Sequence, residues 1–536
     1  MTESDDQTQT ETETETEAVV SDYFDRVLER NPHMATVLGV HDYDSEVPDG
    51  SRDSVLGEIE DAKDVLEEIR ANPDDSLKAE IAASSLEYDI YEMDELRLWE
   101  SDPQAVDGVV SLIYPLFVRD FAPFEERLER IADRLEDCPD YIEETKSRLT
   151  DPVDEWVASE IEACAEIPGL LQLIADHAGD IERQDVAYRI SANSQDVIDA
   201  VDDYRDWLQS LDTRSYDPVG EEKLDRLLEL RYLPPSSEVI EISESEIEAA
   251  DEDLRDAVSE IDAPSFDEAV ESVESDHPET FDGVIDEYRR TADAAYRLTD
   301  GDFADVPESS LRISETPERL RPLIGDSGYV EPTPFGEKDA VYYVSPPADP
   351  EMLRFHNVSE IAYTVFSDVF PGHHLQQVYS SLNESAVYGL AGRFNSFGDD
   401  FVEGWRGYAA QTVIESGFVD ELDTGATAEG LRLVSAEKRI RNACRAVVDM
   451  RLSRGEMTVD EAADYLVDEA GFDPEAAWSE AVAYSRNPGN GVSFTVGRRL
   501  LADLADGTDL SARDFHSRLL EAGGIPVELH RRRIEK

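Results

Sequence analysis

The stretch GDSGYVEPTPFGEKDAVYYVSPPADPEM, residues 325–352, lies between two long regions of helical periodicity. It is rich in glycine and proline, which interrupt helices, and it contains the run AVYYVS, whose valines and tyrosines are typical of a strand. We therefore predict a mainly α-helical, two-lobed architecture with a small β-sheet beside a central cleft. The lobes would cover residues 18–325 and 326–536.

The N-terminal lobe is predicted from repeated amphipathic segments. In AVVSDYFDRVLERN, residues 18–31, apolar residues recur at helical spacing and line one face, and DAKDVLEEIRAN and RLERIADRLED show the same pattern. Short breaks at proline, glycine or asparagine separate such segments. The tract before them, MTESDDQTQTETETETE, is polar and acidic, so residues 1–17 are predicted to be a disordered tail.

Capping residues predict where helices begin in the C-terminal lobe. Ser359 is predicted to begin SEIAYTVFSDVF, and Ser511 to begin the last helix. Thr458 is followed by a glutamate three residues later, which is the pattern of a capping box. Asp473 is followed directly by proline, which favours the first helical position.

The chain is strongly acidic. Its 536 residues include 47 basic and 125 acidic side chains, which gives a net charge of −78. Such a field repels nucleic acid and anionic membranes, so we expect neither as a partner. Lysine occurs seven times and arginine forty times. From the acidic charge we predict a halophilic protein from a salt-accumulating organism. Such a protein should unfold reversibly when salt is removed. The oligomeric state stays open.

The cysteines and the apolar segments bear on the cellular compartment. Cys138, Cys164 and Cys444 are too widely separated for a disulfide framework or a cysteine zinc site, so we expect buried thiols. No segment approaches the ~18 consecutive apolar residues of a membrane span, and the N-terminus lacks an apolar signal region. The expected location is the cytoplasm.

Two adjacent histidines follow a Pro-Gly break in FSDVFPGHHLQQ, residues 366–377, of a chain with nine histidines. The preceding helix should end near Phe370, because Pro371 cannot continue its hydrogen bonds. A second helix then starts with His373 and His374 in its first turn, where the helix dipole favours the neutral, metal-binding imidazole. Helical neighbours point ~100° apart, so one metal would take only one of them.

A metal ion would need further ligands near these histidines. The nearest acidic candidates are Asp368 before the break, Glu384 after it, and Glu403 on FVEGWRGYAAQTVIESGF. Zinc sites with an open coordination position use three nitrogen or oxygen ligands, often histidine with a distant glutamate. No intact HExxH motif is present, so the alternatives are a structural histidine pair and a glutamate at a helix terminus.

Two serine motifs are rejected as nucleophile sites. GDSG, residues 325–328, matches a short serine-protease signature, but a glycine-rich connector in a helical protein lacks the β-barrel that would confirm it. Ser493 in NGVSFTVG lacks the second glycine of a nucleophile elbow.

The motifs SDVFPGHHLQ and EGWRGYAA together resemble those of the domain of unknown function family 885, whose members look like zincin metallopeptidases. That family carries His-Glu-x-x-Pro-Gly-His-His-Leu-Gln and, further on, Glu-Gly-Trp-Ala-x-Tyr-x-Glu. The resemblance covers nearly the whole chain and implies a zincin-like fold. Its other segments are residues 24–51, 218–233, 442–466, 479–497 and 514–530.

The chain departs from the family pattern at chemistry-bearing positions. The histidine and glutamate that open the first family motif fall on Ser367 and Asp368. The second glutamate of the Glu-Gly-Trp motif falls on Ala410, a downstream histidine on Leu452 or a neighbour, and an arginine on Ala483. The retained positions are His373, His374, Gln376, Glu403, Trp405, Tyr408 and Tyr484.

In a first hypothesis, the resemblance implies a metal-dependent peptide hydrolase. His373 and Glu403 would bind zinc, and Asp368 would complete the site or act as general base. Tyr408 or Tyr484 would stabilise the oxyanion that forms on the peptide carbonyl. The supporting residues would be His374, Gln376 and Trp405, the last of which is expected to pack in the core.

In a second hypothesis, the chain binds peptides or a protein partner without turnover and needs no cofactor. Serine is a poor zinc ligand beside imidazole, and Asp368 is one methylene shorter than glutamate. A displacement of ~1 Å can cost on the order of 100-fold in rate. A third hypothesis takes the Pro-Gly-His-His turn as a capped helix start in a scaffold. The sequence leaves all three open.

Overall fold

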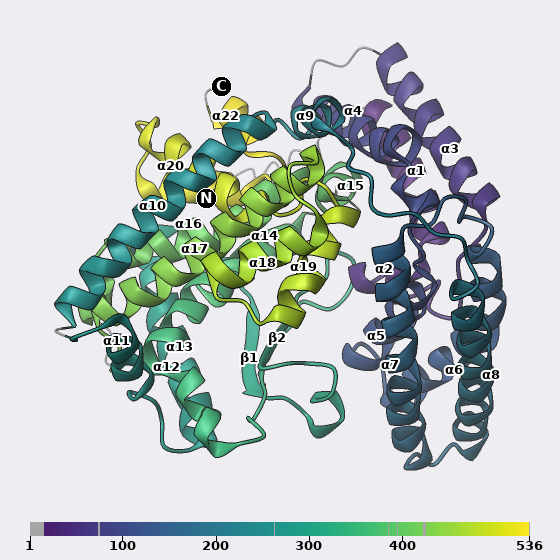
Figure 1. Ribbon diagram of the computed structural model, residues 1–536, viewed down its shortest axis with the longest axis horizontal. Coiled ribbons are helices and arrows are strands. Elements are labelled where there is room, and N and C mark those ends of the chain that lie inside the picture. Colours follow the sequence, from purple (N-terminus) through teal and green to yellow (C-terminus); the bar gives the residue numbers. More distant parts are fainter. Residues whose placement is uncertain are drawn as a thin grey trace, which may run out of the picture.

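The computed structural model describes residues 15–72, 76–261, 263–383, 385–393, 395–421 and 425–534. It is mainly helical with one small sheet, which confirms the predicted fold class (Figure 1). Most of the predicted acidic tail, residues 1–14, lies outside the described residues, whereas its last three residues, 15–17, form the start of the first helix and are not a disordered tail.

The region before the sheet consists of helices, and α5 to α8 among them form a bundle (Figure 1). Their apolar faces share one buried core that includes Leu112, Leu135, Leu171 and Ile190. The helices are α1 (Glu15–Arg30), α2 (Pro32–Leu38), α3 (Arg52–Ala71), α4 (Leu77–Ile90), α5 (Ala105–Val118), α6 (Phe124–Thr145), α7 (Asp154–Gly179), α8 (Gln184–Leu208), α9 (Glu221–Leu230), α10 (Ser236–Glu260), α11 (Phe266–Glu274) and α12 (Phe281–Leu298).

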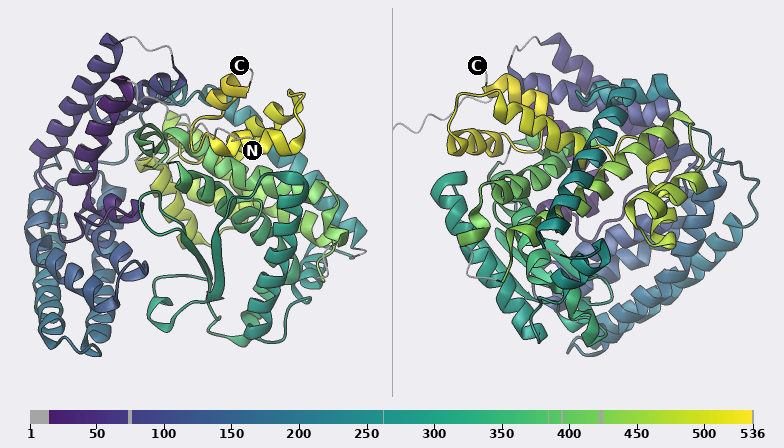
Figure 2. Two further views of the ribbon diagram at one scale, coloured as in Figure 1. Left: turned by 180° about the vertical axis from the view of Figure 1, so that it is seen from behind. Right: turned by 60° about the vertical axis from the view of Figure 1, so that its left-hand side comes forward.

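The sheet has the order β1 (Ser310–Glu315), β3 (Asp339–Val344), β2 (Ser327–Val330), with β1 parallel and β2 antiparallel to β3. The predicted strand is β3. Successive residues of a strand face opposite ways, and Tyr342 packs into the core beside α12 whereas Tyr343 packs into the bundle core. Figure 2 shows the sheet between α12 and the bundle of α5 to α8. The sheet therefore joins the two predicted lobes, whose boundary stays a prediction.

Helices return after the sheet, and three of their predicted N-caps are confirmed. Thr458, Asp473 and Ser511 each accept a hydrogen bond from the first helical turn. The helix that Ser511 begins is not the last one as predicted, because a further helix covers Val527–Ile534. The prediction for Ser359 is wrong, because the side chain of Asn357 caps that helix and Ser359 is buried inside its first turn. The helices are η5 (Pro350–His356), α13 (Val358–Thr364), the π-helix η6 (Val365–Val369), α14 (His373–Leu382), α15 (Ala386–Arg393), α16 (Asp399–Glu415), α17 (Ala428–Arg454), α18 (Val459–Ala470), α19 (Pro474–Arg486), α20 (Ser493–Asp506), α21 (Ala512–Glu521) and α22 (Val527–Ile534).

Two helices of the C-terminal region approach each other closely. A Cβ added to Gly404 of α16 would lie 2.5 Å from the carbonyl carbon of Gly497 on α20. A side chain at either position would push the helices apart. Also on α16, the buried carboxylate of Asp400 accepts a hydrogen bond from the Val527 N–H at 3.0 Å. This bond joins α16 to α22. The position of α16 is thus fixed at its first turns.

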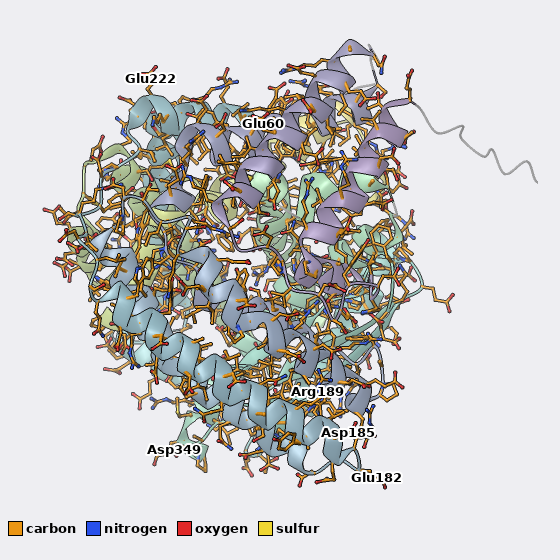
Figure 3. The ribbon with its side chains drawn as sticks, turned by 90° about the vertical axis from the view of Figure 1, so that its right-hand side faces the viewer. Glu60, Glu182, Asp185, Arg189, Glu222 and Asp349 are labelled. Atoms are coloured by element: carbon orange, nitrogen blue, oxygen red, sulfur yellow. The ribbon has the colours of Figure 1, made fainter. Side chains whose placement is uncertain are left out.

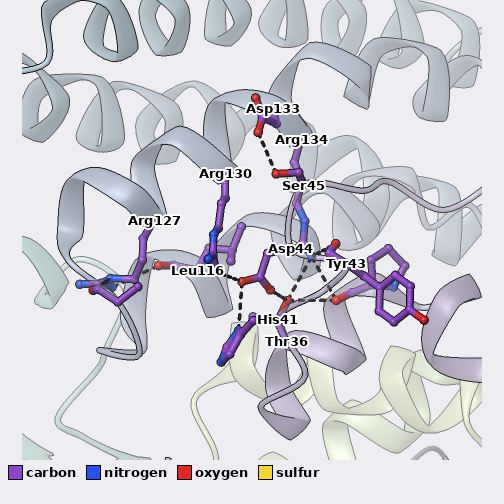
Figure 4. Close-up of polar contacts among 12 residues, drawn as sticks. Thr36, His41, Tyr43, Asp44, Ser45, Leu116, Arg127, Arg130, Asp133 and Arg134 are labelled. Carbon is purple, nitrogen blue, oxygen red and sulfur yellow. Dashed lines mark hydrogen bonds and ion pairs between the residues drawn. The ribbon is translucent and has the colours of Figure 1, made fainter. Parts of the chain in front are cut away.

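A polar cluster links helix α6 to the turn that follows α2 (Figure 4). The buried carboxylate of Asp44 contacts His41 at 3.0 Å and also pairs with Arg130, while Arg134 is fully buried and donates to backbone carbonyls. Burial alone would lower the pKa of His41, but the carboxylates of Asp44 and Glu337 raise it to about 9. Buried charges require such partners, so this cluster is structural.

Charged side chains cover the outside of the molecule, as the labelled residues Glu60, Glu182 and Glu222 illustrate (Figure 3). The three cysteines are buried free thiols, as predicted.

Among the described residues, no helix has both the length and the apolar character that a membrane crossing requires.

Candidate functional site

The site is built around the turn between η6 and α14. The Phe370 N–H closes η6 with a hydrogen bond to the Val365 carbonyl at 2.9 Å, and the bond from Phe370 to Pro371 is cis. A Cβ at Gly372 would overlap the carbonyl of Ser367, so only glycine fits this turn. The helix end near Phe370 and the restart at His373 are therefore confirmed.

Trp405 of α16 holds this turn in place. Its indole Nε1–H lies 3.0 Å from the carbonyl oxygen of Pro371 and 3.2 Å from that of Gly372. The ring is fully buried and meets Phe303 edge to face. Trp405 therefore packs in the core, as the sequence predicted.

The two histidines point to different surroundings. His374 is fully buried, with Nδ1 2.7 Å from the Tyr329 hydroxyl, and burial lowers its pKa to about 3. His373 is half-buried; its Nε2 lies 3.4 Å from Nε2 of Gln377, and its Nδ1 has no hydrogen-bond partner. Burial and the nearby Arg406 lower the pKa of His373. Both rings are therefore neutral at pH 7.

A salt-bridged triad lies beside these histidines. The Arg406 guanidinium donates to Asp368 Oδ1 at 2.7 Å and to Glu403 Oε2 at 3.0 Å. Ser367 Oγ donates to the same Asp368 oxygen at 2.8 Å. Burial alone would raise the pKa of Asp368, but Arg406 and Ser367 outweigh it and hold this pKa below its usual value. Asp368 in turn raises the pKa of Arg406.

This triad lines a cavity of about 270 Å³. Its walls come from α10, α13, η6, α16, α17 and α20, and Tyr363 and Phe494 supply aromatic surface. A second cavity of about 820 Å³ borders it, and Thr364, Asp368 and Lys438 line both. Ligand sites of proteins commonly have such volumes, so the two cavities form the candidate site.

The remaining predicted residues lie away from the smaller cavity. The Tyr408 hydroxyl is 2.9 Å from His516 Nε2 in the core, and burial raises the pKa of this tyrosine to about 12. The Tyr484 hydroxyl donates to Glu480 one turn earlier on α19. Gln376 is buried, and its Oε1 has no hydrogen-bond partner. Neither tyrosine lines either cavity.

A model of the family described as "Bacterial protein of unknown function (DUF885)" matches residues 32–534. The chain belongs to this family. The match covers more than nine-tenths of the chain and includes every residue of the candidate site. A comparison with curated proteins finds no match.

Two solved structures share the DUF885 chain's fold. A candidate lipoprotein of unknown function from Shewanella oneidensis matches with a TM-score of 0.75 at 17% identity, over 98% of this chain and 100% of that one. A candidate lipoprotein from Colwellia psychrerythraea matches with a TM-score of 0.80 at 14% identity, over 98% and 99%. At such identities the likeness concerns the fold alone.

Sequence reasoning missed Arg406. The resemblance to DUF885 gives the motif Glu-Gly-Trp-Ala, in which alanine stands where this chain has arginine. That departure was visible in the sequence, but its meaning depends on the position of Asp368, 38 residues earlier. The triad therefore appears only when η6 and α16 are seen side by side.

The residues present do not fit the zinc site that the DUF885 resemblance implied. Arg406 donates to Oδ1 of Asp368 and to Oε2 of Glu403, one oxygen of each carboxylate that a metal would need. Within the described ranges, no group of three or more histidine, cysteine, aspartate or glutamate side chains is arranged to hold a metal ion. Glu384 lies outside the described residues. Zinc bound by His373 and Glu403 stays a prediction.

Proposed function

We propose that this DUF885 protein binds peptides in its paired cavities without hydrolysing them. The observation that supports this proposal is the Arg406 guanidinium, which contacts both Asp368 and Glu403. An arginine stays protonated at all working pH values and donates in a fixed fork. It therefore acts as a permanent internal cation between the two acids, and a divalent ion beside it would be repelled.

The same contacts weaken Asp368 as a general base. An efficient base has a pKa near the working pH, whereas Arg406 and Ser367 hold the pKa of Asp368 low. One of its oxygens is also engaged, since Ser367 and Arg406 both donate to Oδ1, whereas among the described residues Oδ2 has only the Tyr342 hydroxyl at 3.5 Å. Removal of a proton from water by this carboxylate is thus disfavoured by its low pKa.

A metal-dependent peptide hydrolase is the second candidate, and one observation favours it. Nδ1 of His373 is buried without a hydrogen-bond partner, and the ring is neutral at pH 7, as a metal ligand must be. The zincin-like architecture inferred from the family resemblance points the same way. This function would require Arg406 to leave the carboxylates.

Metal content and peptide cleavage together test the proposal. The wild type, His373→Ala, Arg406→Ala and the control Arg432→Ala, which alters a salt bridge to Glu260, are equilibrated with zinc in molar salt and freed of excess. We expect well under one zinc per wild-type chain by mass spectrometry, no cleavage of a peptide library, and saturable peptide binding. Near-stoichiometric zinc in the wild type, lost together with cleavage in His373→Ala, would contradict the proposal.

We also propose that the protein is salt-adapted and acts in the cytoplasm of a salt-accumulating organism. The excess of 125 acidic over 47 basic residues supports this. Circular dichroism during salt dilution should show reversible loss of helicity. Full helicity in dilute buffer would argue against the proposal.

A further inference from the structure

The smaller cavity is basic, although the chain is acidic. Its described lining contains five cationic and three acidic side chains, whereas the whole chain has 47 and 125. A concave, weakly hydrated wall with this charge concentrates anions. The cationic side chains are Arg406, Lys438, Arg439, Arg445 and Arg498, and the acidic ones are Glu246, Asp368 and Glu403.

Two of these cations have their carboxylate partner outside this cavity. Lys438 pairs with Glu360 at 2.6 Å and Arg445 with Glu480 at 2.6 Å, and neither glutamate lines the smaller cavity. Arginine carries five N–H donors and lysine three. One carboxylate therefore leaves donors on each side chain for a ligand.

Two further arginines of the lining share an acid. Arg439 and Arg498 both pair with Glu246, and Arg439 also pairs with Asp253, which does not line the smaller cavity. The Arg498 side chain is 14% exposed, so it is held in place and largely desolvated. Arg406 adds a buried Nε–H without a hydrogen-bond partner. Desolvated, prepositioned guanidinium groups suit a carboxylate, which they bind in a bidentate manner.

The larger cavity has the opposite character. Its described lining contains five acidic side chains against two cationic ones, Lys438 and Arg441. Met352 and Phe355 on its wall are 44% and 46% exposed, so they offer apolar contact area. The acidic side chains are Glu274, Asp326, Glu360, Asp368 and Glu437.

The two cavities meet at Thr364, Asp368 and Lys438, which line both. A ligand that spans them needs a negative end and a positive, partly apolar end. We infer that the occupant is a short peptide bound in one direction, with its C-terminal carboxylate in the basic cavity and a cationic, apolar N-terminal portion in the acidic cavity. This inference rests on the proposed peptide-binding function and adds the polarity and charge of the peptide.

A matched pair of peptide pools tests this direction. Pentapeptides of the form Lys-X-X-X-X are offered to the full-length wild type in molar potassium chloride, once as free acids and once as C-terminal amides. Retained peptides are quantified by mass spectrometry. We expect the acids to bind about 10- to 100-fold more tightly, since hydrogen bonds to a charged group contribute roughly 1.5–3 kcal/mol. Equal retention of the acid and amide pools would overturn the inference. It would do so even if the retained peptides were enriched in acidic side chains, because the carboxylate bound would then not be the C-terminal one.

Neighbouring arginines on α20 provide the matched variants. Arg498→Gln should reduce binding of the acid pool about tenfold and leave the amides unchanged. Arg499 is 58% exposed and pairs with Asp503 outside the cavities, so Arg499→Gln should change neither pool. If the folded Arg498→Gln variant still bound the free acids more tightly than the amides, the peptide carboxylate would have to bind elsewhere. That result would overturn the inference.

The outcomes separate this inference from the proposed function. Retention of both pools to the same extent, without cleavage, supports peptide binding but overturns the direction. Cleavage of the acid pool alone overturns the non-hydrolytic proposal and supports the direction. Retention of no peptide overturns both.

Discussion

Helix α16 presents two faces that obey different constraints. On the inner face, Trp405 and Tyr408 are buried and hold the turn before α14 and the core beside α21. On the outer face, Glu403 and Arg406 line the smaller cavity. The inner-face residues match the family motif, whereas the outer face carries the departure at Arg406. Packing can thus be retained while the chemistry of a site changes.

The reason lies in what each face interacts with. Trp405 contacts backbone carbonyls and apolar rings, which persist whatever ligand the protein binds. Arg406 contacts two carboxylates whose charge must be balanced by some cation. A guanidinium or a metal ion can provide that balance. The outer face can therefore exchange one for the other without disturbing the fold.

Trp405→Ala should give the largest loss of stability. Truncation of a fully buried tryptophan creates a cavity and typically costs about 3–5 kcal/mol, and the two carbonyls would also lose their donor. Chemical denaturation in molar salt measures the loss. Trp405→Phe, which keeps most of the apolar volume, is the control and should lose less. A loss below about 1 kcal/mol would show that the inner face does not hold the fold.

Arg406→Ala should have a smaller effect on stability and a larger one on the site. It leaves Asp368 and Glu403 without their shared cation, at a cost of about 2 kcal/mol at pH 7 because the triad is partly solvated. Arg406→Lys keeps the positive charge but not the forked guanidinium, so it should lose only part of this stability. Denaturation curves of the three proteins provide the measurement.

The pH dependence of that loss checks its cause. The pKa of Asp368 is lowered in the folded state, so its stabilisation is present above the unfolded value near 3.9 and is lost as pH falls through the folded pKa. The stability gap between wild type and Arg406→Ala should therefore narrow below about pH 4. A constant gap would assign the loss to packing instead.

The sequence predicted those features that depend on local chemistry. The break at Pro371, the strand at β3 and the caps at Thr458 and Asp473 follow from residues within one turn of each other. The error at Ser359 is also local, since Asn357 lies two residues earlier and is an equally good cap. Local signals thus located the elements to within a few residues.

The site was only partly predictable, because it depends on contacts between distant segments. The sequence indicated Asp368, His373 and Glu403, but the Arg406 bridge requires knowledge of how η6 and α16 pack. Likewise, Tyr408 matches the family motif, yet which group its hydroxyl meets is decided by α21, about a hundred residues later. Motif positions identify residues; their partners come from the tertiary structure.

The buried His516 should make the inner face sensitive to acid. Its Nδ1–H donates to the Phe303 carbonyl at 2.9 Å, and burial lowers its pKa to about 4. Unfolded histidine titrates near 6.5, so the unfolded state binds more protons between pH 6.5 and about 4, and stability falls as pH falls through this window. At pH 5 this amounts to about 2 kcal/mol. The outer face, with its low-pKa carboxylate, should not respond until lower pH.

Denaturation of wild type and His516→Asn at pH 7 and pH 5 measures how much His516 contributes to the loss of stability in acid. The variant is expected to be less stable at pH 7, because asparagine loses the ring packed on Phe303. The difference between the proteins should shrink by about 2 kcal/mol at pH 5. An unchanged difference would mean that another group carries the acid sensitivity.

Tyr408→Phe should have the smallest effect, and it decides to which face Tyr408 belongs. The hydroxyl donates to His516 Nε2, because Nδ1 of that ring already carries the proton donated to Phe303. Removal of one such hydrogen bond costs about 1 kcal/mol and leaves the ring packing intact. Peptide binding should not change, since Tyr408 lines neither cavity. Tyr484→Phe, whose hydroxyl contacts Glu480, is the matched control. If Tyr408→Phe altered peptide binding or cleavage while Tyr484→Phe did not, the hydroxyl would have to reach the ligand, and the division of α16 into a packing face and a site face would fail.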